Sequence, residues 1–281
     1  MQGKTVLITG ADGDIGRETT RALARKGATI VMACISAAAA EPVCREIRSQ
    51  SGNQNIEVME FDLASLDSVR ACAAGFARRH RQLHVLLNNA GVYCHRRAET
   101  RDGFEKTMGI NYLGPFLLTN LLLPLLRQTP GARIVNVASN AFSQGAIDPE
   151  DLHFTKKYSG FKAYASSKLA IVLFTRELAE RLQGTGVTVN ALHPGHVATG
   201  IWNIWPGRWY QGLLERILNR FMITPQEGSL TSVYLASSDE VQGISGNYFD
   251  KQKPRDVSTK CRDVQLQKKL WQLSEEMTGI S

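Results

Sequence analysis

Tyr164 and Lys168, a tyrosine and a lysine four positions apart, form the pair in this sequence with the clearest capacity for chemistry. On a helix, residues i and i+4 lie on one face, one turn apart. A free tyrosine has a pKa of about 10, too high for a base at neutral pH, and a neighbouring ammonium favours its phenolate. We therefore expect Tyr164, with a lowered pKa, to exchange a proton with an alcohol or carbonyl oxygen. Chance also places tyrosine and lysine at this spacing in many helices. Other motifs in the sequence must therefore show whether this pair is functional.

Two further polar residues stand where they can support this chemistry. Ser139 follows the apolar run Arg133–Val137, and a hydroxyl at the carboxyl end of a strand can polarise a substrate oxygen as charge develops. Asn111 falls inside a long expected helix, where a buried amide costs stability unless it is hydrogen-bonded. This cost is consistent with a functional or structural water beside Asn111.

A glycine-rich turn from Thr9 to Gly16 joins the first expected strand to the first expected helix. Glycines let the backbone approach a phosphate closely, and the N–H groups at a helix start attract its charge. Such a cluster is often only a turn, but this position favours a pyrophosphate site. Turn-forming residues also follow three later strands, in Asp62-Leu63, in Asn88-Asn89-Ala90-Gly91 and in the segment His193–Thr199.

These turns and the Tyr164–Lys168 pair resemble the motifs of the short-chain dehydrogenase/reductase family. They follow one another in the family's order, and the resemblance extends from Lys4 to about Phe249. The match comprises TGxxxGxG in part, NNAG, YxxxK and PGxVxT. The segments Phe174–Ala179, Tyr234–Ser238 and Ser245–Phe249 are most similar to the retinol-dehydrogenase-like branch. The resemblance implies an NAD(P)(H)-dependent oxidoreductase that moves hydride between a nicotinamide and a carbonyl or alcohol carbon.

The resemblance also implies the roles of individual residues. The catalytic set would be Asn111, Ser139, Tyr164 and Lys168, with Asn111 supporting a proton-relay water and Lys168 also holding the nicotinamide ribose. No metal is expected, because the histidines form no HExxH or similar pair. The cofactor-binding set would be Gly10, Asp12, Gly13, Asp14, Ile15, Gly16, Ile35, Asp62, Leu63, Asn89, Ala90, Gly91, Tyr164, Lys168, Pro194, Gly195, Val197 and Thr199.

Three residues depart from the family pattern, and all of them lie near the expected cofactor. Asp14 replaces the middle glycine of the turn, so either the turn is rearranged around Gly13 or a carboxylate weakens phosphate binding. Ala138 stands where relatives usually have a first serine. Ile35 stands where the branch typically carries an arginine. These departures motivate an alternative, a catalytically weak cofactor-binding sensor or scaffold protein of the same fold.

The cofactor preference follows from the end of the second expected strand. An acid there would bind the free ribose hydroxyls of NAD, and a base would pair with the 2′-phosphate of NADP. The segment from Ala33 to Ala37 offers neither. Because no acid repels a phosphate, Arg17 is near and the chain is basic, we favour NADP(H) over NAD(H).

Strand and helix patterns alternate along the chain, which predicts right-handed crossovers and a parallel sheet covered on both faces. We predict a single doubly wound, Rossmann-type α/β domain over residues 1–281, with a seven-stranded, mostly parallel sheet. Expected helices are Ile15–Lys26, Pro42–Ser49, Leu66–His80, Phe104–Gln128, Tyr164–Gln183 and Thr224–Ser237, with a C-terminal helical tail at about 262–278. Expected strands are Thr5–Thr9, Thr29–Ala33, Ile56–Phe61, His84–Asn88, Arg133–Val137, Val187–Leu192 and Asn247–Phe249.

Composition narrows the class of protein. Five scattered cysteines without CxxC spacing argue against a disulfide framework or a structural zinc site and favour a reducing compartment. The net charge of +7 suits an anionic cofactor or an acidic membrane surface, and no nucleic-acid-binding motif accompanies it. The apolar stretch Phe116–Leu126 is shorter than the roughly 20 residues of a membrane-spanning helix. We expect a chain that is not secreted, has no transmembrane helix and is cytoplasmic or peripheral on an intracellular membrane.

A tryptophan-rich segment at about 196–223 is expected to form a lid over the substrate, as in the family. Its Trp202, Trp205 and Trp209 favour a large lipophilic carbonyl or alcohol, retinoid-, steroid- or aldehyde-like. Two alternatives stay open for this segment, inward packing and an interfacial helix that would make peripheral membrane contact. The faces of the fourth and fifth helices often form dimers in the family, which implies a homodimer.

Overall fold

The short apolar runs of the chain pair into one sheet with the strand order β3-β2-β1-β4-β5-β6-β7-β8. The first seven strands are parallel, and the order reverses beside β1, which is where sheets of this kind bind ligands. The structure is a computed structural model that describes residues 1–197 and 222–280. The strands are β1 (Thr5–Thr9), β2 (Thr29–Cys34), β3 (Ile56–Glu60), β4 (Val85–Asn88), β5 (Arg133–Val137), β6 (Thr188–His193), β7 (Tyr248–Asp250) and β8 (Lys253–Arg255).

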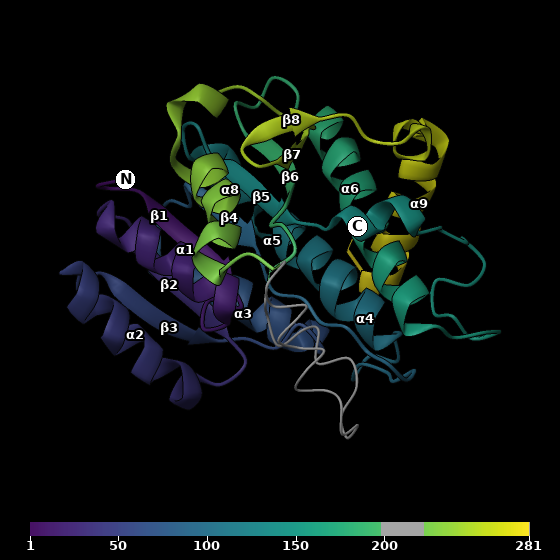
Figure 1. The fold of residues 1–281 in the computed structure, drawn as a ribbon, viewed down its shortest axis with the longest axis horizontal. Coiled ribbons are helices and arrows are strands. Elements are labelled where there is room, and N and C mark those ends of the chain that lie inside the picture. Colours follow the sequence, from purple (N-terminus) through teal and green to yellow (C-terminus); the bar gives the residue numbers. More distant parts are fainter. Residues whose placement is uncertain (198–221, 281) are drawn as a thin grey trace.

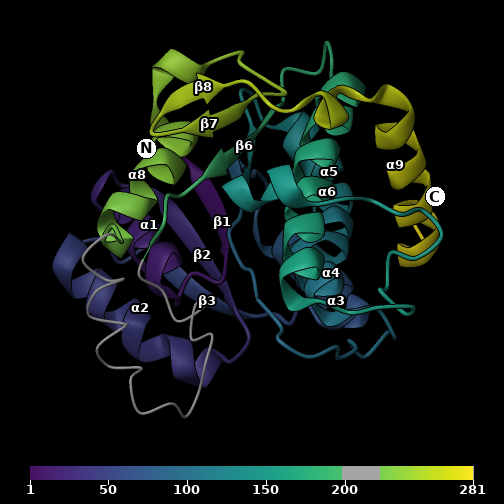
Figure 2. The ribbon, with the colours of Figure 1, turned by 45° about the vertical axis from the view of Figure 1, so that its right-hand side comes forward.

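Helices cover both faces of the sheet, as Figures 1 and 2 show. One layer holds α1, α2 and α8, and the opposite layer holds α3, α5 and α6 with α9 packed against them. This is the doubly wound Rossmann-type fold that the sequence predicts. The helices are α1 (Asp14–Arg25), α2 (Ala37–Ser51), α3 (Leu66–Arg79), α4 (Lys106–Met108), α5 (Gly114–Gln128), α6 (Gly160–Arg181), α8 (Pro225–Ser237) and α9 (Val264–Thr278), with the short turns η1 (Gly109–Leu113), η2 (Asn140–Gln144), η4 (Asp239–Val241) and η5 (Thr259–Arg262).

The prediction of seven strands is wrong by one, because the sheet has eight. No strand is expected after Phe249, but β8 pairs antiparallel with β7 after a two-residue turn at Lys251 and Gln252. Both turn residues have positive φ, which matches the twist of a tight hairpin. The three residues of β8 are exposed and include Pro254, as suits an edge strand. A strand this short and polar leaves no apolar alternation in the sequence.

Two helices begin earlier than the sequence patterns predict. α2 starts at Ala37 and not at Pro42, because Ser36 caps it by accepting a hydrogen bond from the Ala39 N–H at 3.3 Å. α6 starts at Gly160 and not at Tyr164, which places Tyr164 in the second turn of the helix. α8 starts at Pro225, next to its expected start at Thr224, because Thr224 and Glu227 form a reciprocal capping box there.

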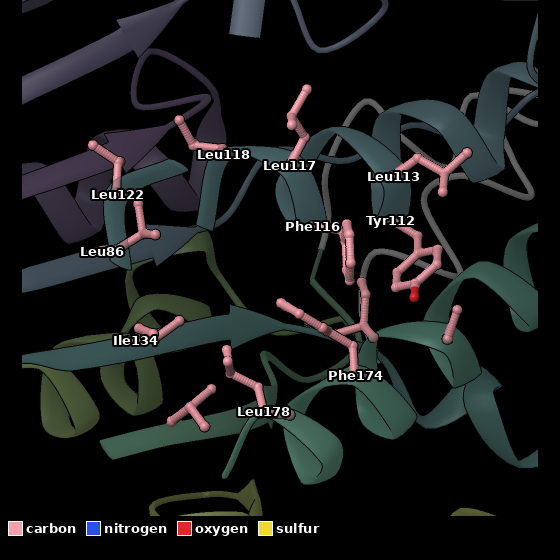
Figure 3. Packing of buried hydrophobic residues seen from close by; sticks show 14 of the residues in the cluster. Leu86, Tyr112, Leu113, Phe116, Leu117, Leu118, Leu122, Ile134, Phe174 and Leu178 are labelled. Carbon is pink, nitrogen blue, oxygen red and sulfur yellow. The ribbon is translucent and has the colours of Figure 1, made fainter. Parts of the chain in front are cut away.

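Aromatic side chains join α5 and α6 on the inner face of their layer. Figure 3 shows Tyr112, Phe116 and Phe174 pointing toward one another, and the rings of Phe116 and Phe174 lie 5.4 Å apart. Burying an aromatic side chain of this size stabilises the fold by about 1.5–3 kcal/mol. Trp271 of α9 completes the cluster at 5.0 Å from Phe116.

The C-terminal helix docks on this aromatic cluster. Asp263 caps α9 by accepting hydrogen bonds from the N–H groups of Gln265 and Leu266. An apolar stripe of α9 faces the core, with Leu270 fully buried and Leu266, Leu273 and Met277 packed against the same cluster. The C-terminal helix is therefore docked on the core.

Within the described residues, the continuous helix Lys106–Gln128 is long and apolar enough to cross a membrane by length and composition. However, 67% of its apolar window is buried inside the fold. Leu117, Leu118 and Leu122 of this helix are buried in the same core as Leu86 of β4 and Ile134 of β5 (Figure 3). The helix is a core element here, as the sequence predicts for Phe116–Leu126.

Candidate functional site

A cavity of about 860 Å³ opens at the edge of the sheet where β1, β4, β5 and β6 end. All predicted cofactor residues from Gly10 to Val197 line it, and so do Ser139, Tyr164 and Lys168. The chain therefore brings segments that are far apart in sequence into one cavity. Thr199 and the predicted lid residues Trp202, Trp205 and Trp209 lie outside the described residues.

The glycine-rich turn from Gly10 to Gly16, here named the glycine cradle, is tightly packed and has the form of a phosphate-binding turn. Gly10 has a φ of +61°, which favours glycine, and a Cβ atom on Gly16 would lie 2.0 Å from the Gly10 carbonyl oxygen. Gly13 is the N-cap of α1, with an extended backbone and no side chain to cap the first N–H groups. This end of α1 presents the positive end of its dipole to the cavity.

Asn89 ties the glycine-rich turn to the end of β4. Its Nδ2 donates to the carbonyl oxygens of Thr9 at 2.9 Å and Gly10 at 3.1 Å. In return, the Thr9 hydroxyl accepts hydrogen bonds from the N–H groups of Asn89 and Ala90, both at 3.0 Å. These bonds fix the cradle and the NNAG segment relative to each other.

The structure places Asp14 at the wall of the cavity. Asp14 is the first residue of α1 and lines the cavity, and Gly13 has a φ of −77°, which any residue adopts. The nearby Arg17 is paired with Glu46. That hydrogen bond is the largest cause of the raised pKa of Arg17, and Asp14 adds a smaller effect in the same direction. A carboxylate at this place repels a phosphate.

The adenosine end of the cavity has an apolar wall. Ile35 follows β2 and is 73% exposed, although it lines the cavity. Asp62 accepts a hydrogen bond from the Ala64 N–H at 2.9 Å, which orders the turn after β3. An exposed isoleucine at this place offers no acid to ribose hydroxyls and no base to a phosphate.

The catalytic candidates meet at the opposite end of the cavity. Lys168 Nζ lies 5.6 Å from the ring centroid of Tyr164 and donates to the Val137 carbonyl oxygen at 2.9 Å. The Ser139 hydroxyl is hydrogen-bonded to Tyr164. Since Ser139 lies two residues after the end of β5 and the other two lie one helical turn apart on α6, two segments bring all three side chains together.

Burial dominates the protonation of these groups. It raises the pKa of Tyr164, and the hydrogen bond with Ser139 opposes this rise. The sequence argument, which expected a lowered pKa for Tyr164, omitted the cost of burying a phenolate. Burial also lowers the pKa of Lys168 to about 8, so its ammonium charge is only moderately favoured at neutral pH.

Asn111 stands behind the cavity and holds its wall in place. Its side chain accepts from the Val92 N–H at 2.8 Å and donates to the Val92 carbonyl oxygen and the Ser167 hydroxyl, both at 3.0 Å. The residue lies in the π-helical turn η1, a form that is frequent at functional sites. A Cβ on Gly91 would lie 3.4 Å from both Asn111 Oδ1 and Lys168 Nζ, so the two residues flank one glycine.

Sequence reasoning missed several residues of the cavity, and two of them are Tyr93 and His193. Tyr93 follows the NNAG segment and places its ring 5.6 Å from that of Tyr164. No role is predicted for His193 itself, but it is the last residue of β6 and is buried in the cavity wall. Burial lowers its pKa to about 4, so the imidazole is neutral at pH 7. Its position at the carboxyl end of a central strand is the signal that could have identified it.

The depressed pKa of Lys168 predicts a pH-dependent stability. Between about pH 8 and pH 10.5 the unfolded chain binds more protons at this lysine than the folded chain, so stability rises with pH through that window. We expect the wild type to gain on the order of 2–3 kcal/mol relative to Lys168→Met between about pH 7 and pH 10. Urea unfolding at several pH values measures this difference, with exposed Lys268→Met as the control. Parallel curves for wild type and Lys168→Met would contradict the assigned burial.

Among residues 1–197 and 222–280, no group of three or more histidine, cysteine or acidic side chains is arranged to hold a metal ion. The cavity is instead suited to an elongated organic ligand. Its glycine cradle leaves no room for side chains at one end, and the proton-exchanging groups stand at the other. These residues fit a nicotinamide dinucleotide with its pyrophosphate at α1 and its nicotinamide beside Tyr164.

Comparisons with known proteins agree with this geometry. A family model described as short chain dehydrogenase matches residues 4–206. Human retinol dehydrogenase 14 is 44% identical over 294 residues, covering 100% of this chain and 88% of the relative, and human retinol dehydrogenase 12 is 44% identical with the same coverage. A crystal structure of an uncharacterized protein from Mycobacterium paratuberculosis is similar with a TM-score of 0.81 and 35% identity, over 99% of this chain and 94% of that one.

Proposed function

This chain belongs to the short-chain dehydrogenase family and is an NAD(P)-dependent oxidoreductase of the CH–OH and C=O groups, and from that premise we propose that it converts a lipophilic carbonyl or alcohol, with NADP(H) preferred. The observation that carries the proposal is the convergence of Ser139, Tyr164 and Lys168 at one end of a cavity whose other end is a glycine cradle. This convergence favours an enzyme over the sensor or scaffold alternative.

Different residues of the cavity would bind different parts of the dinucleotide. The turn from Gly10 to Gly16 would hold the pyrophosphate, Asp62 and Leu63 the adenine end, and Asn89 to Gly91 the ribose and nicotinamide. The segment with Pro194, Gly195 and Val197 would meet the nicotinamide carboxamide, with Thr199 from outside the described residues. When bound, the nicotinamide supplies or accepts the hydride.

Two side chains would act on the substrate oxygen, and a third would support them. Tyr164 gives its phenolic proton to a carbonyl oxygen during reduction, or takes the hydroxyl proton during oxidation. Ser139 donates a hydrogen bond where negative charge develops on that oxygen. Lys168 would hold the ribose and, as an ammonium one turn from Tyr164, would favour the phenolate. Asn111 keeps the Val92 backbone, and hence the NNAG wall, in register with the lysine.

Aromatic side chains support a lipophilic substrate. Tyr93 lies beside Tyr164, and Phe161, 38% exposed on α6, lines the cavity one turn before it. Apolar rings next to the reacting groups bind apolar substrates through burial of surface. The two relatives reported above are named retinol dehydrogenases. Retinol is an apolar alcohol, so their names agree with this substrate class.

The residue at the end of β2, Ile35, supports the preference for NADP(H). With an exposed isoleucine in place of an acid, no carboxylate at the end of β2 repels a 2′-phosphate. The net charge of +7 favours the more anionic cofactor, whereas Arg17 on α1 is paired with Glu46. NAD(H) is the alternative that a direct titration distinguishes.

A homodimer and a peripheral membrane contact stay predictions. The expected dimer face lies on α5 and α6, and α9 packs over part of both helices through Trp271. Mass determination in solution tests the dimer. The membrane contact, and with it a cytoplasmic or membrane-peripheral location, rests on residues 202–221, which lie outside the described residues. Liposome co-sedimentation that loses its signal when these tryptophans are replaced tests it.

A substrate screen tests the proposed function. Retinal, steroid ketones and short and long aliphatic aldehydes are offered with NADPH and with NADH, and consumption of reduced nicotinamide is followed. We expect turnover that rises with the apolar size of the substrate and a lower KM for NADPH. Turnover confined to small polar substrates would contradict the lipophilic class. Binding of neither nicotinamide at millimolar concentration would favour the scaffold.

A further inference from the structure

The backbone that follows Ser139 decides where its hydroxyl points. Residues 139–146, here named the Ser139 loop, include the short helix η2. Ser139 is the N-cap of η2 and accepts a hydrogen bond from the Ala141 N–H at 3.3 Å. Its side chain is therefore attached to this loop as much as to β5, and a shift of the loop moves the hydroxyl relative to Tyr164.

One side of the Ser139 loop lies against α6. A Cβ on Gly145 would lie 2.3 Å from the Ala165 carbonyl oxygen, so the loop backbone touches the helix directly beside Tyr164. The Ala146 N–H donates to the Ser166 hydroxyl at 3.1 Å. These contacts set the closest approach of the loop to α6, but alone they do not stop it from moving away.

The other side of the loop is held by residues more than 100 positions later in the chain. The buried Tyr248 of β7 donates its hydroxyl to Asn140 Oδ1 at 2.8 Å and packs edge-on against Phe142. Lys260 donates its ammonium to the carbonyl oxygens of Ser143 at 2.6 Å and Gly145 at 2.7 Å. Hydrogen bonds from a charged donor are the stronger kind, and here they close the end of η2.

We propose that Tyr248 and Lys260 are positioning residues that hold the Ser139 hydroxyl at its hydrogen-bonding distance from Tyr164. Neither side chain is among the described residues that line the cavity, so each acts through the loop. The inference rests on the proposed catalytic role of Ser139. Misplacing a catalytic group by about 1 Å can cost on the order of 10²-fold in rate, so these three hydrogen bonds at the edge of the site can matter for turnover.

The test uses Tyr248→Phe and Lys260→Met, each of which removes hydrogen bonds and keeps most of the side-chain volume. We expect kcat to fall about tenfold in each variant and more in the double variant, with unchanged cofactor affinity by fluorescence titration. Lys260→Arg, which keeps a charged donor, should recover most of the rate. Matched controls are Tyr234→Phe, which loses a surface hydrogen bond to Glu240, and Lys268→Met on α9.

A double-mutant cycle separates positioning from a general loss of stability. In a Ser139→Ala background, Tyr248→Phe should cause little further loss of kcat, because the group that it positions is gone. A full additional loss in that background, or a wild-type kcat in both single variants, would overturn the inference. If Ser139→Ala itself keeps wild-type turnover, the proposed role of Ser139 fails instead, so the two failures are distinguishable.

Discussion

Tyr164→Phe is expected to lower kcat by about 10²- to 10⁴-fold while leaving cofactor binding within about twofold of wild type. The change removes one oxygen from a side chain that is 5% exposed, and that oxygen is the one hydrogen-bonded to Ser139. Without it, no phenolic proton reaches the substrate oxygen, and Ser139 alone can only polarise it. The phenyl ring keeps its packing against Tyr93, so the cavity wall should remain.

Steady-state and single-turnover rates with the best substrate from the screen measure this effect. The matched control is Tyr234→Phe, whose hydroxyl bonds to Glu240 outside the cavity and whose loss should leave kcat unchanged. A kcat for Tyr164→Phe within about threefold of wild type would refute the acid–base role. A parallel loss of cofactor affinity would instead indicate that the cavity had rearranged.

Gly16→Ala is expected to weaken cofactor binding by about 10²-fold or more and to destabilise the fold by about 1–3 kcal/mol. The added methyl group would lie 2.0 Å from the Gly10 carbonyl oxygen and 2.8 Å from Asn89 Nδ2. Both of these groups are rigid, since Asn89 bonds to the Thr9 and Gly10 carbonyl oxygens. The turn must therefore open, which moves the first N–H groups of α1 away from a pyrophosphate.

Fluorescence titration with NADPH and urea unfolding measure the two parts of this prediction. Gly75→Ala is the matched control, because its methyl group would come no closer than 3.8 Å to a neighbour and lies within α3. In a helix interior this change should leave stability equal or slightly higher. Wild-type affinity in Gly16→Ala would show that the turn does not carry the cofactor phosphates.

Local patterns explain how much of the fold was predictable. Apolar runs of strand length, separated by amphipathic segments, predicted seven of the eight strands and the wound topology. β8 was missed because a three-residue polar strand at a sheet edge needs no apolar alternation. The start of α2 was misplaced because the predictive weight went to Pro42, whereas the Ser36 cap sets the boundary.

The candidate site, like the fold, was predictable from the sequence only in part. The sequence determined which residue types stand after which strands, because a motif such as NNAG or YxxxK is a property of a few neighbouring positions. What surrounds each side chain was decided by the tertiary structure. Burial raises the pKa of Tyr164 and lowers that of Lys168, and Asn111 turns out to bind the backbone of Val92.

The sequence by itself thus determined the fold class, the glycine cradle and the pair Tyr164 and Lys168, since short-range spacing specifies each of them. Only the tertiary structure decided that His193 lines the cavity and that Tyr248 and Lys260 reach the Ser139 loop. The physical reason is that desolvation and hydrogen bonding depend on every segment packed nearby. Those segments are distant in the chain and leave no periodic signal in it.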